Sequence, residues 1–426
     1  MAKGKNPRRE KKTKSSLSAN FKRERVVTRS QDRAVGEATR RVALRELEAA
    51  AKKLAKERAE ALSNEPAKAR GNRNDGQLHL AFVRMGQGDC TIITTPKGRT
   101  IMIDCGSAAK ERSSTKAHSS GMDTSADESS DDNAAYLKKI RDTIYGPKFL
   151  KSSTALDVLI LTHPDTDHYN QLQSVLDDDT SIKSIYHSAK LVKYSVGQHS
   201  AWLKTHIDSE AHIYAVTVNK TKGKIKQIIN DQPVATMDST TKINRVDTNG
   251  AIRIVDEEKC KISILASNVA AEQKATKRDK GTDINRGSVV TLIEAFNKKI
   301  VICGDATSTT EKFLVGQYPT LLAGVNLLQV PHHGSAVTSS TDLLVDTLKP
   351  KMAIISAGKQ VRKDHLPSFD TIGKYLAHQT NEKAHKHEIF YWMKGNRGSF
   401  FAQSSFYEKP IFVTGSNETQ ELVFSG

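Results

Sequence analysis

The segment Thr162–His168 contains two histidines and two aspartates, and all four side chains can bind a metal ion. It follows a short apolar run, Val158–Leu161, which predicts a buried strand. A loop that leaves such a strand carries its side chains to one edge of a sheet. Imidazole and carboxylate groups together can hold two divalent ions, which activate a water molecule and clamp negatively charged oxygens. The side chains concerned are His163, Asp165, Asp167 and His168.

Two later apolar runs also end in residues that can bind metal. The run 300–303 is followed by a glycine and Asp305, and the run 327–330 is followed by a proline and the pair His332–His333. Taken alone, Asp305 could be a turn or helix-cap acid, and the two histidines could be solvated on the surface. Three clusters of the same design predict instead one metal cavity along one edge of the sheets.

Further apolar runs predict the strands and helices that must position these loops. The predicted strands are 78–83, 91–94, 100–104, 252–255, 261–265, 288–293, 299–303 and 352–356. The predicted helices are 134–145, 168–177, 308–317, 339–347 and 368–379. The first three strands are expected to form a meander at the edge of a sheet. Runs of strands with helices between them indicate two sheets covered by helices, an α/β layered arrangement. The polar stretch 187–250 has too weak a pattern to place.

Charge divides the chain into a basic extension and a body. Residues 1–75 hold 22 Lys and Arg and 10 Asp and Glu, a net charge of +12, which leaves +5 of the total of +17 for the rest. Residues 1–35 are too polar to offset chain entropy and are predicted to be disordered. Residues 36–76 are predicted to hold a helix and a linker, and residues 77–426 a catalytic domain with a flexible Ser- and Asp-rich insertion at 106–133. The helix, at 42–62, has one narrow apolar stripe, with which it either docks on the body or pairs with another protein chain; the alternative is a solvated helix.

Composition also predicts the cellular compartment of the protein. No segment approaches the ~18 consecutive apolar residues of a membrane span, and the first residues do not resemble a signal peptide. The chain is therefore predicted to be cytoplasmic, with no membrane partner. The four cysteines have no C-x-x-C spacing, so they are predicted to be free thiols in a reducing compartment.

Five motifs occur in an order that resembles that of metallo-β-lactamase-fold hydrolases. They are Gly86–Asp89, Ile103–Gly106, His163–His168, Cys303–Asp305 and Val330–Ser335. More narrowly, residues 78–380 resemble the soluble domain of the ComEC-type competence proteins. The resemblance implies a four-layer αβ/βα sandwich with two divalent metal ions at its rim.

The resemblance also implies a role for each cluster. His163 and Asp165 would bind one ion, and the last two members of that motif would bind the second. Asp305 would bridge the two ions, and either His332 or His333 would complete the set.

Three further residues are implied to support the ligands. Asp104 would orient a ligand loop, while Asn285 and Ser288 match a polar segment that lies near the site in the ComEC-type group. A fourth position departs from the superfamily, because Asp165 stands where a second histidine is usual. Oxygen-rich coordination keeps Mn²⁺ and Mg²⁺ open beside Zn²⁺.

A later ligand histidine of the superfamily has no clear equivalent here, so one metal position is expected to be short of protein ligands and weakly occupied. Several histidines lie in the interval, but none follows an apolar strand, so all are predicted to lie on the surface. They are His187, His199, His206 and His212.

The leading functional prediction is a metal-dependent phosphodiesterase that cleaves nucleic acid, with DNA ahead of RNA, through a metal-activated water held near Asp167. His365, in a segment resembling the family's G-H-P-S motif with one residue inserted, is either a proton donor to the leaving oxygen or an ordinary residue at a helix start. The basic extension would attract a polyanion without regard to sequence. Candidate phosphate contacts are Arg286, Lys359, Arg362 and Lys363.

Two alternatives remain open from the sequence. The same chemistry could act on a small cyclic or oligonucleotide phosphodiester, because the +5 of the body does not demand an extended basic groove. The chain could also be a non-catalytic protein that binds nucleic acid or a partner and has lost one metal.

Overall fold

The computed structural model describes the greater part of the body of the chain. The described residues are 74–108, 130–150, 155–188, 193–194, 202–203, 207–219, 222–229, 232–237, 250–269, 282–358, 365–379 and 382–426. They belong to the second of two compact units, Gly71–Gly426. The predicted tail, the helix at 42–62 and most of the 106–133 insertion lie outside them, as do Lys359, Arg362, Lys363, His199 and His206.

The first sheet contains the strand that leads into the opening motif. Among the described residues its strands are β1 (Leu78–Phe82), β2 (Thr91–Thr94), β3 (Thr100–Ile103), β4 (Ala155–Leu156), β5 (Val158–Leu161), β6 (Ser181–His187), β7 (Ile207–Asn219), β8 (Lys222–Ile229), β9 (Gln232–Met237) and β19 (Gln420–Phe424). Their order is β19-β1-β2-β3-β5-β6-β7-β8-β9, with β4 paired to β6. The strands β3, β5, β6 and β7 run parallel, so the motif after β5 leaves at the carboxyl edge of this group.

The second sheet carries the other two metal-binding loops. Its described strands are β10 (Ile252–Asp256), β11 (Cys260–Ala266), β12 (Val290–Ala295), β13 (Lys298–Ile302), β14 (Leu327–Gln329), β15 (Met352–Ile355) and β18 (Ile411–Val413), in that order across the sheet. From β13 to β18 the neighbours are parallel. The loops after β13 and β14 therefore leave at the same edge.

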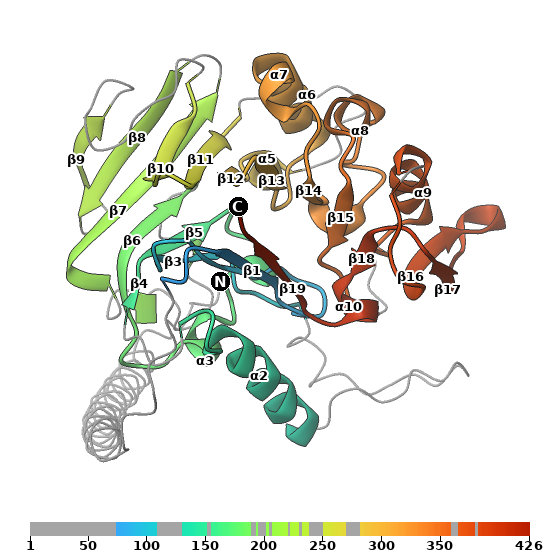
Figure 1. Cartoon of the computed structure of the whole chain (residues 1–426), viewed down its shortest axis with the longest axis horizontal. Helices are drawn as coiled ribbons and strands as arrows, with labels where there is room; N and C mark the ends of the chain where they lie inside the picture. Colours follow the sequence, from blue (N-terminus) through green and yellow to red (C-terminus); the bar gives the residue numbers. More distant parts are fainter. Residues whose placement is uncertain are drawn as a thin grey trace, which may run out of the picture. The chain divides into compact units, whose positions relative to one another are not determined.

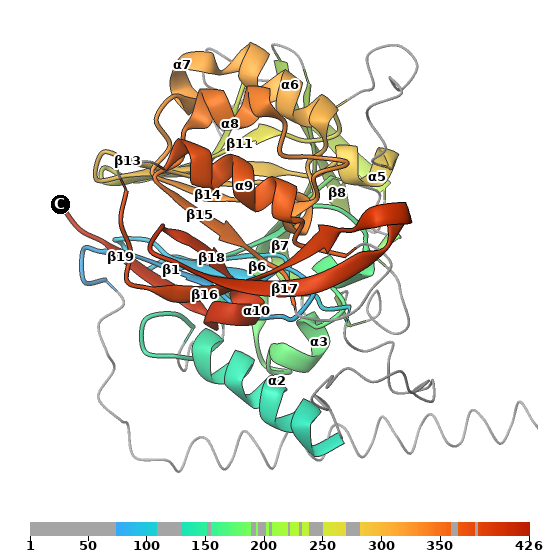
Figure 2. The ribbon, with the colours of Figure 1, turned by 90° about the vertical axis from the view of Figure 1, so that its right-hand side faces the viewer.

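Helices cover the outer face of each sheet. They are α2 (Ser130–Ile144) and α3 (Leu172–Val175) on the first sheet, and α6 (Ser308–Gln317), α7 (Pro319–Leu322), α8 (Asp342–Leu348) and α9 (Phe369–His378) on the second. Figure 2 shows these four layers, with α6 to α9 on one side of the paired sheets and α2 and α3 on the other. The short segments α5 (Asp283–Arg286) and α10 (Thr414–Asn417) lie outside these layers.

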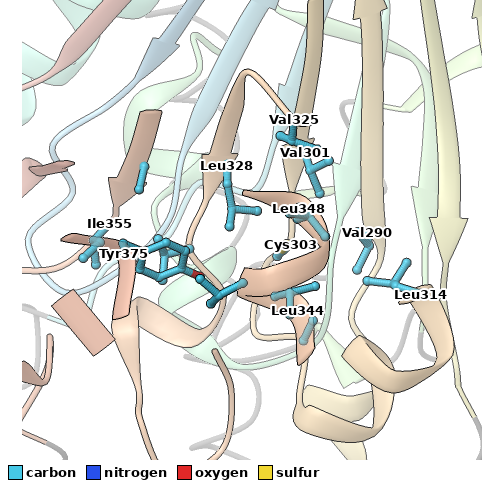
Figure 3. Packing of buried hydrophobic residues seen from close by; sticks show 14 of the residues in the cluster. Val290, Val301, Cys303, Leu314, Val325, Leu328, Leu344, Leu348, Ile355 and Tyr375 are labelled. Carbon is cyan, nitrogen blue, oxygen red and sulfur yellow. The ribbon is translucent and has the colours of Figure 1, made fainter. Parts of the chain in front are cut away.

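Three apolar clusters join the layers. The inner faces of the two sheets pack together through buried residues such as Leu80, Ile160 and Ile300. A second cluster lies between the second sheet and its helices, where Figure 3 shows Leu328 and Leu344 among the packed side chains. A third lies between the first sheet and α2 and α3. Burial of both faces explains why the strands are continuous apolar runs.

The structure corrects several details of the predicted elements. The meander does not lie at the edge of its sheet, because β19, from the end of the chain, pairs with β1. The helix predicted at 134–145 begins at Ser130, and the one predicted at 168–177 is reduced to α3, preceded by the 3₁₀ turn Thr166–His168. Described parts of 187–250 form β7, β8 and β9.

The prediction for His187 was wrong. This residue ends β6 and is fully buried, and its ring makes an edge-to-face contact with Tyr194. Polar residues interrupt its strand, which therefore lacks the continuous apolar run that marked the other strand ends. His212, by contrast, is exposed.

Two compositional expectations can be compared with the described residues. All four cysteines are buried and free. No helix within the described ranges has the length and apolar character needed to cross a membrane.

Candidate metal centre

Asp305 lies at the point where the three motif loops meet. Its Oδ1 atom is 3.2 Å from His168 Nε2 and 3.5 Å from His333 Nε2. Its Oδ2 atom is 3.7 Å from His163 Nε2 and 3.5 Å from His332 Nε2. The two oxygens of one buried carboxylate therefore face two different pairs of imidazoles.

One further aspartate accompanies each pair. Asp165 Oδ2 is 3.5 Å from His163 Nε2, and Asp167 Oδ2 is 3.5 Å from His333 Nε2. The alternation of the opening motif thus sends Asp165 to one side of Asp305 and Asp167 to the other. Both histidines of the later pair take part, one on each side, where the sequence had left the choice between them open.

The hydrogen bonding of the polar atoms in this cluster shows that these residues fit a divalent cation. Among the described residues, no hydrogen-bond partner is found for the buried Nε2 atoms of His163, His168 and His333, or for Asp305 Oδ1. Buried polar atoms are nearly always satisfied, so four that point at one another require an explanation. Cations with nitrogen and oxygen ligands would satisfy all of them.

Each imidazole is held from behind through its Nδ1 atom. His168 Nδ1 bonds to Asp104 Oδ2 at 2.7 Å, and His333 Nδ1 donates to the Ser356 carbonyl at 2.7 Å. His332 Nδ1 lies 2.7 Å from Thr338 Oγ1. Such bonds fix the tautomer and aim the free Nε2 at the cation.

The supporting residues predicted from the sequence lie beside these ligands. Ser288 Oγ is 3.3 Å from His163 Nδ1, and Asn285 Nδ2 donates to Asp305 Oδ2 at 3.1 Å. Asp104 accepts the Thr162 backbone N–H at 2.8 Å as well as the bond to His168. Asp104 therefore ties the ligand to the loop that carries it.

Asp89 is a site residue to which the sequence analysis gave no role. One ligand atom from each of Asp89, His168, Asp305 and His333 lies within 4.8 Å of the others. Gln329 Nε2 donates to Asp89 Oδ1 at 2.7 Å, so the last residue of β14 holds this carboxylate. The signal was present in the motif Gly86–Asp89, which had been used only to support the resemblance.

Close backbone contact fixes the 3₁₀ turn that carries Asp167 and His168. Asp89 N donates to the Asp167 carbonyl at 3.2 Å, and Cys105 N donates to the His168 carbonyl at 2.8 Å. A Cβ on Gly106 would lie 2.3 Å from the Asp167 carbonyl carbon. A glycine is needed there because any side chain would displace the ligand turn.

Arg286 and His365 do not join the groups that converge on Asp305. Arg286 is buried, and its guanidinium pairs with Asp283 within α5. His365 stacks on Phe400, with ring centroids 4.3 Å apart. Its segment still contacts the centre, because Ser368 N donates at 3.1 Å to the carbonyl of Gly334, the residue after His333.

The charges of the centre perturb the pKa values of its groups. Burial alone would raise the pKa of Asp305, but the imidazoles, His332 and His333 foremost, outweigh it and hold that pKa well below its usual range. Burial would lower the pKa of His333, but Asp305 and Asp167 raise it to about 10. The pKa of His168 is raised well above its usual value, against burial, mainly by Asp305. A cation that binds here would therefore compete with protons on His168 and His333.

These shifts predict that metal binding releases protons. His168 and His333 have raised pKa values in the metal-free protein, so protons compete at every pH below those values, and the competition weakens as the pH rises. We expect metal affinity to increase with pH through the neutral range. Calorimetric titration with Mn²⁺ in buffers of different ionisation enthalpy should detect the released protons. A binding enthalpy independent of the buffer would contradict this.

A second prediction concerns Asp104. Removing its carboxylate frees the His168 ring, so Asp104→Ala should weaken metal binding about 10- to 100-fold. The matched control is Glu257→Gln, because Glu257 is also buried and accepts a bond from Thr95 Oγ1 at 2.8 Å. Glu257 lies in the turn before β11, at the opposite end of the strands from the metal loops. Equal affinities in the two variants would show that Asp104 does not position the ligand.

Comparisons with known proteins extend the picture. No protein-family model matches the chain. It is similar to ComE operon protein 3 of Bacillus subtilis (strain 168), 26% identical over 216 residues, which is 50% of this chain and 22% of that protein. It is also similar to Recombination protein 2 of Haemophilus influenzae, 33% identical over 75 residues, which is 18% of this chain and 9% of that protein. The matched region is thus less than a quarter of either relative.

The architecture is the four-layer αβ/βα sandwich that the motifs predicted, with two facing mixed sheets, outer helices and metal-binding loops at one edge. Solved structures that align with it include the short form of human tRNase Z, with 11% identity, a TM-score of 0.34 and coverage of 65% of this chain and 91% of that one. Zn²⁺-bound PqqB from Methylobacterium extorquens aligns with 9% identity, a TM-score of 0.36 and coverage of 81% and 100%.

Proposed function

We propose that this chain is a metal-dependent phosphodiesterase that acts on nucleic acid, with DNA as its main substrate. The observation that carries the proposal is the division of six ligands into two sets by Asp305. Two ions shared by one carboxylate, when bound, would supply an activated water and positive charge for the phosphate oxygens. A phosphodiester needs both, because its cleavage accumulates negative charge on oxygen.

The chain's own residues then have distinct tasks. One ion would be held by His163, Asp165 and His332, and the second by their counterparts on the other side of Asp305. Asn285 would keep the Asp305 carboxylate in place through its 3.1 Å hydrogen bond. Each side has two imidazoles and a further aspartate. This removes the reason to expect one position to be short of protein ligands.

The donor set also bears on metal identity. Four imidazoles favour Zn²⁺ over Mg²⁺, which prefers oxygen ligands and retains several waters, and the aspartates keep Mn²⁺ as a candidate. We therefore propose two Zn²⁺ or Mn²⁺ ions.

Residues outside the metal-binding set also have proposed tasks. His365 remains the candidate proton donor to the leaving oxygen, because its segment packs against Gly334 beside His333. The basic residues at 359, 362 and 363 directly precede it in the sequence and are proposed to contact phosphate. Arg286 is buried and paired with Asp283, so its proposed task is to hold α5, and with it Asn285.

Activity should depend on the shared carboxylate. Asp305→Asn is expected to lower kcat/KM on DNA by roughly 10³-fold, the scale seen when a charge-stabilising group is removed, and Asp167→Ala should act in the same direction. Asp157→Asn is the control, because Asp157 precedes β5 at the end away from the metal and bonds Thr100 N at 2.9 Å. The assay is cleavage of single- and double-stranded DNA and RNA with Mn²⁺ or Zn²⁺, alongside elemental analysis.

Two outcomes would contradict the proposal. One is that the unchanged protein leaves every nucleic acid intact with either metal, as Asp305→Asn does. The other is less than one equivalent of metal per chain together with tight DNA binding and no cleavage, which would indicate a binding protein instead.

The basic extension distinguishes nucleic acid from a small phosphodiester, the alternative favoured by the +5 of the body. If residues 1–70 contact phosphates, their removal should raise KM for DNA and make log KM depend less steeply on log salt, since fewer counterions are displaced. Turnover of a cyclic dinucleotide, measured in parallel, should change little. If removal of residues 1–70 leaves the DNA kinetics unaltered, and the cyclic dinucleotide is turned over faster than DNA, the small phosphodiester would be favoured as the substrate.

A further inference from the structure

A two-stranded hairpin stands apart from both large sheets. It consists of β16 (His387–Lys394) and β17 (Phe400–Tyr407), and Figure 1 shows it beyond α9 at one end of the layers. Three phenylalanine rings on β17 are exposed, Phe400 by 44%, Phe401 by 39% and Phe406 by 65%. These are half of the large apolar side chains that the described residues leave exposed. A strand with three exposed rings is unusual unless it meets a ligand.

The two faces of the hairpin differ in what covers them. On one face Ile389 and Tyr391 are buried, and Tyr391 contacts Phe369 of α9 at 4.9 Å between ring centroids. On the other face Phe390 and Trp392 are buried as well, but at its tip Phe400 lies directly across from Lys394, which is exposed. The tip of this second face therefore presents an aromatic ring beside a cation.

His365 joins this face to the metal centre. Its ring lies parallel to Phe400, with centroids 4.3 Å apart and planes 7° apart, and edge-on to Trp392 at 4.8 Å. Pro367 accepts the Trp392 backbone N–H at 2.8 Å, and Ser368 binds the Gly334 carbonyl at 3.1 Å. A short rigid segment thus leads from the ligand His333 to the stacked pair.

We propose that Phe400, supported by His365, forms a stacking platform for an unpaired nucleobase next to the phosphate held at the metal centre. The inference rests on the proposed function and specifies its substrate as a single strand or a frayed strand end, because a base must leave its duplex to stack on a protein ring. An exposed aromatic face accepts any base, so the platform selects strandedness and not sequence.

The chemistry of the surrounding surface fits nucleic acid better than a protein partner. Phe401 lies on the opposite face, and the two rings that share this face, Phe400 and Phe406, are separated along β17 by Ala402 and Ser404, which are small, and not by aliphatic residues. Lys386 lies over the Phe406 ring at 5.6 Å, and Lys394 flanks Phe400, so cations accompany the rings. Glu388, the acid on this face, accepts a hydrogen bond from Ser404 and pairs in register with Phe406, at the end away from Phe400.

The test uses the full chain and a single-stranded oligonucleotide with a terminal 2-aminopurine, whose fluorescence is quenched when it stacks. Phe400→Leu keeps the apolar bulk but removes the aromatic face, and should lose the quenching and weaken binding about tenfold, within the range for one stacked base. Phe400→Trp should retain both. An abasic strand should bind to the unchanged protein as weakly as the intact strand binds to Phe400→Leu.

Phe406→Leu is the matched control. It changes a more exposed ring of the same strand, ~20 Å from Phe400 at the rise of an extended strand, and should leave quenching and affinity as in the unchanged protein. The platform is refuted if both variants weaken binding equally, if neither does, or if Phe400→Leu instead dissociates an oligomer on size-exclusion chromatography, which would make this face a contact between proteins.

The outcome is separable from that of the proposed function. Base-dependent quenching without any cleavage would support the platform while refuting the nuclease. Cleavage that is dependent on Asp305 but equal in Phe400→Leu and in the unchanged protein, with intact and abasic strands alike, would support the nuclease while refuting the platform.

Discussion

The arrangement of the centre depends on the electrostatic interactions between one buried carboxylate and the imidazoles around it. Asp305 faces four imidazole Nε2 atoms, two on each oxygen. Without a cation, this cluster can be stable only by retaining protons, which the raised pKa values of His168 and His333 reflect. The fold therefore gathers buried polar atoms that a divalent cation would satisfy. Such a site is preorganised, since the ligands are already held at their far nitrogens.

That preorganisation comes from contacts between the two halves of the sandwich. The ligand turn after β5 belongs to the first sheet, whereas Asp305 and the His332–His333 pair belong to the second. Gln329, at the end of β14, bonds to Asp89 of the first half at 2.7 Å. Because the apolar core between the sheets fixes their separation, it also fixes the distances among the ligands. The metal centre is thus a consequence of packing as much as of its motifs.

The proposed division of labour separates attraction from positioning. The basic extension carries +12 of the net charge and would act over a distance that salt screens. The hairpin would act only at contact, through the ring of Phe400 and the cation beside it. A body of charge +5 is then sufficient, because the strand is gathered by one part of the chain and oriented by another.

Which residues lie at the carboxyl ends of buried strands can be predicted from the amino-acid sequence. Strand ends after continuous apolar runs can be recognised locally, and so the opening motif, Asp305 and the histidine pair were all identified, together with the layered α/β fold. His187 was misplaced for the same reason, since polar residues interrupt its strand and its burial comes from pairing with β5 and β7.

How those residues divide between the two oxygens of Asp305 depends on the packing of the whole fold. The positive φ values of His332 and His333, 52° and 51°, turn two adjacent histidines to opposite oxygens of Asp305, which no local pattern predicts. Asp89 joined the centre through Gln329, a residue 240 positions away. The stacking of His365 on Phe400 likewise unites two distant segments. Strand ends are local properties of sequence, but the contacts between loops are set by the packing of two sheets against each other.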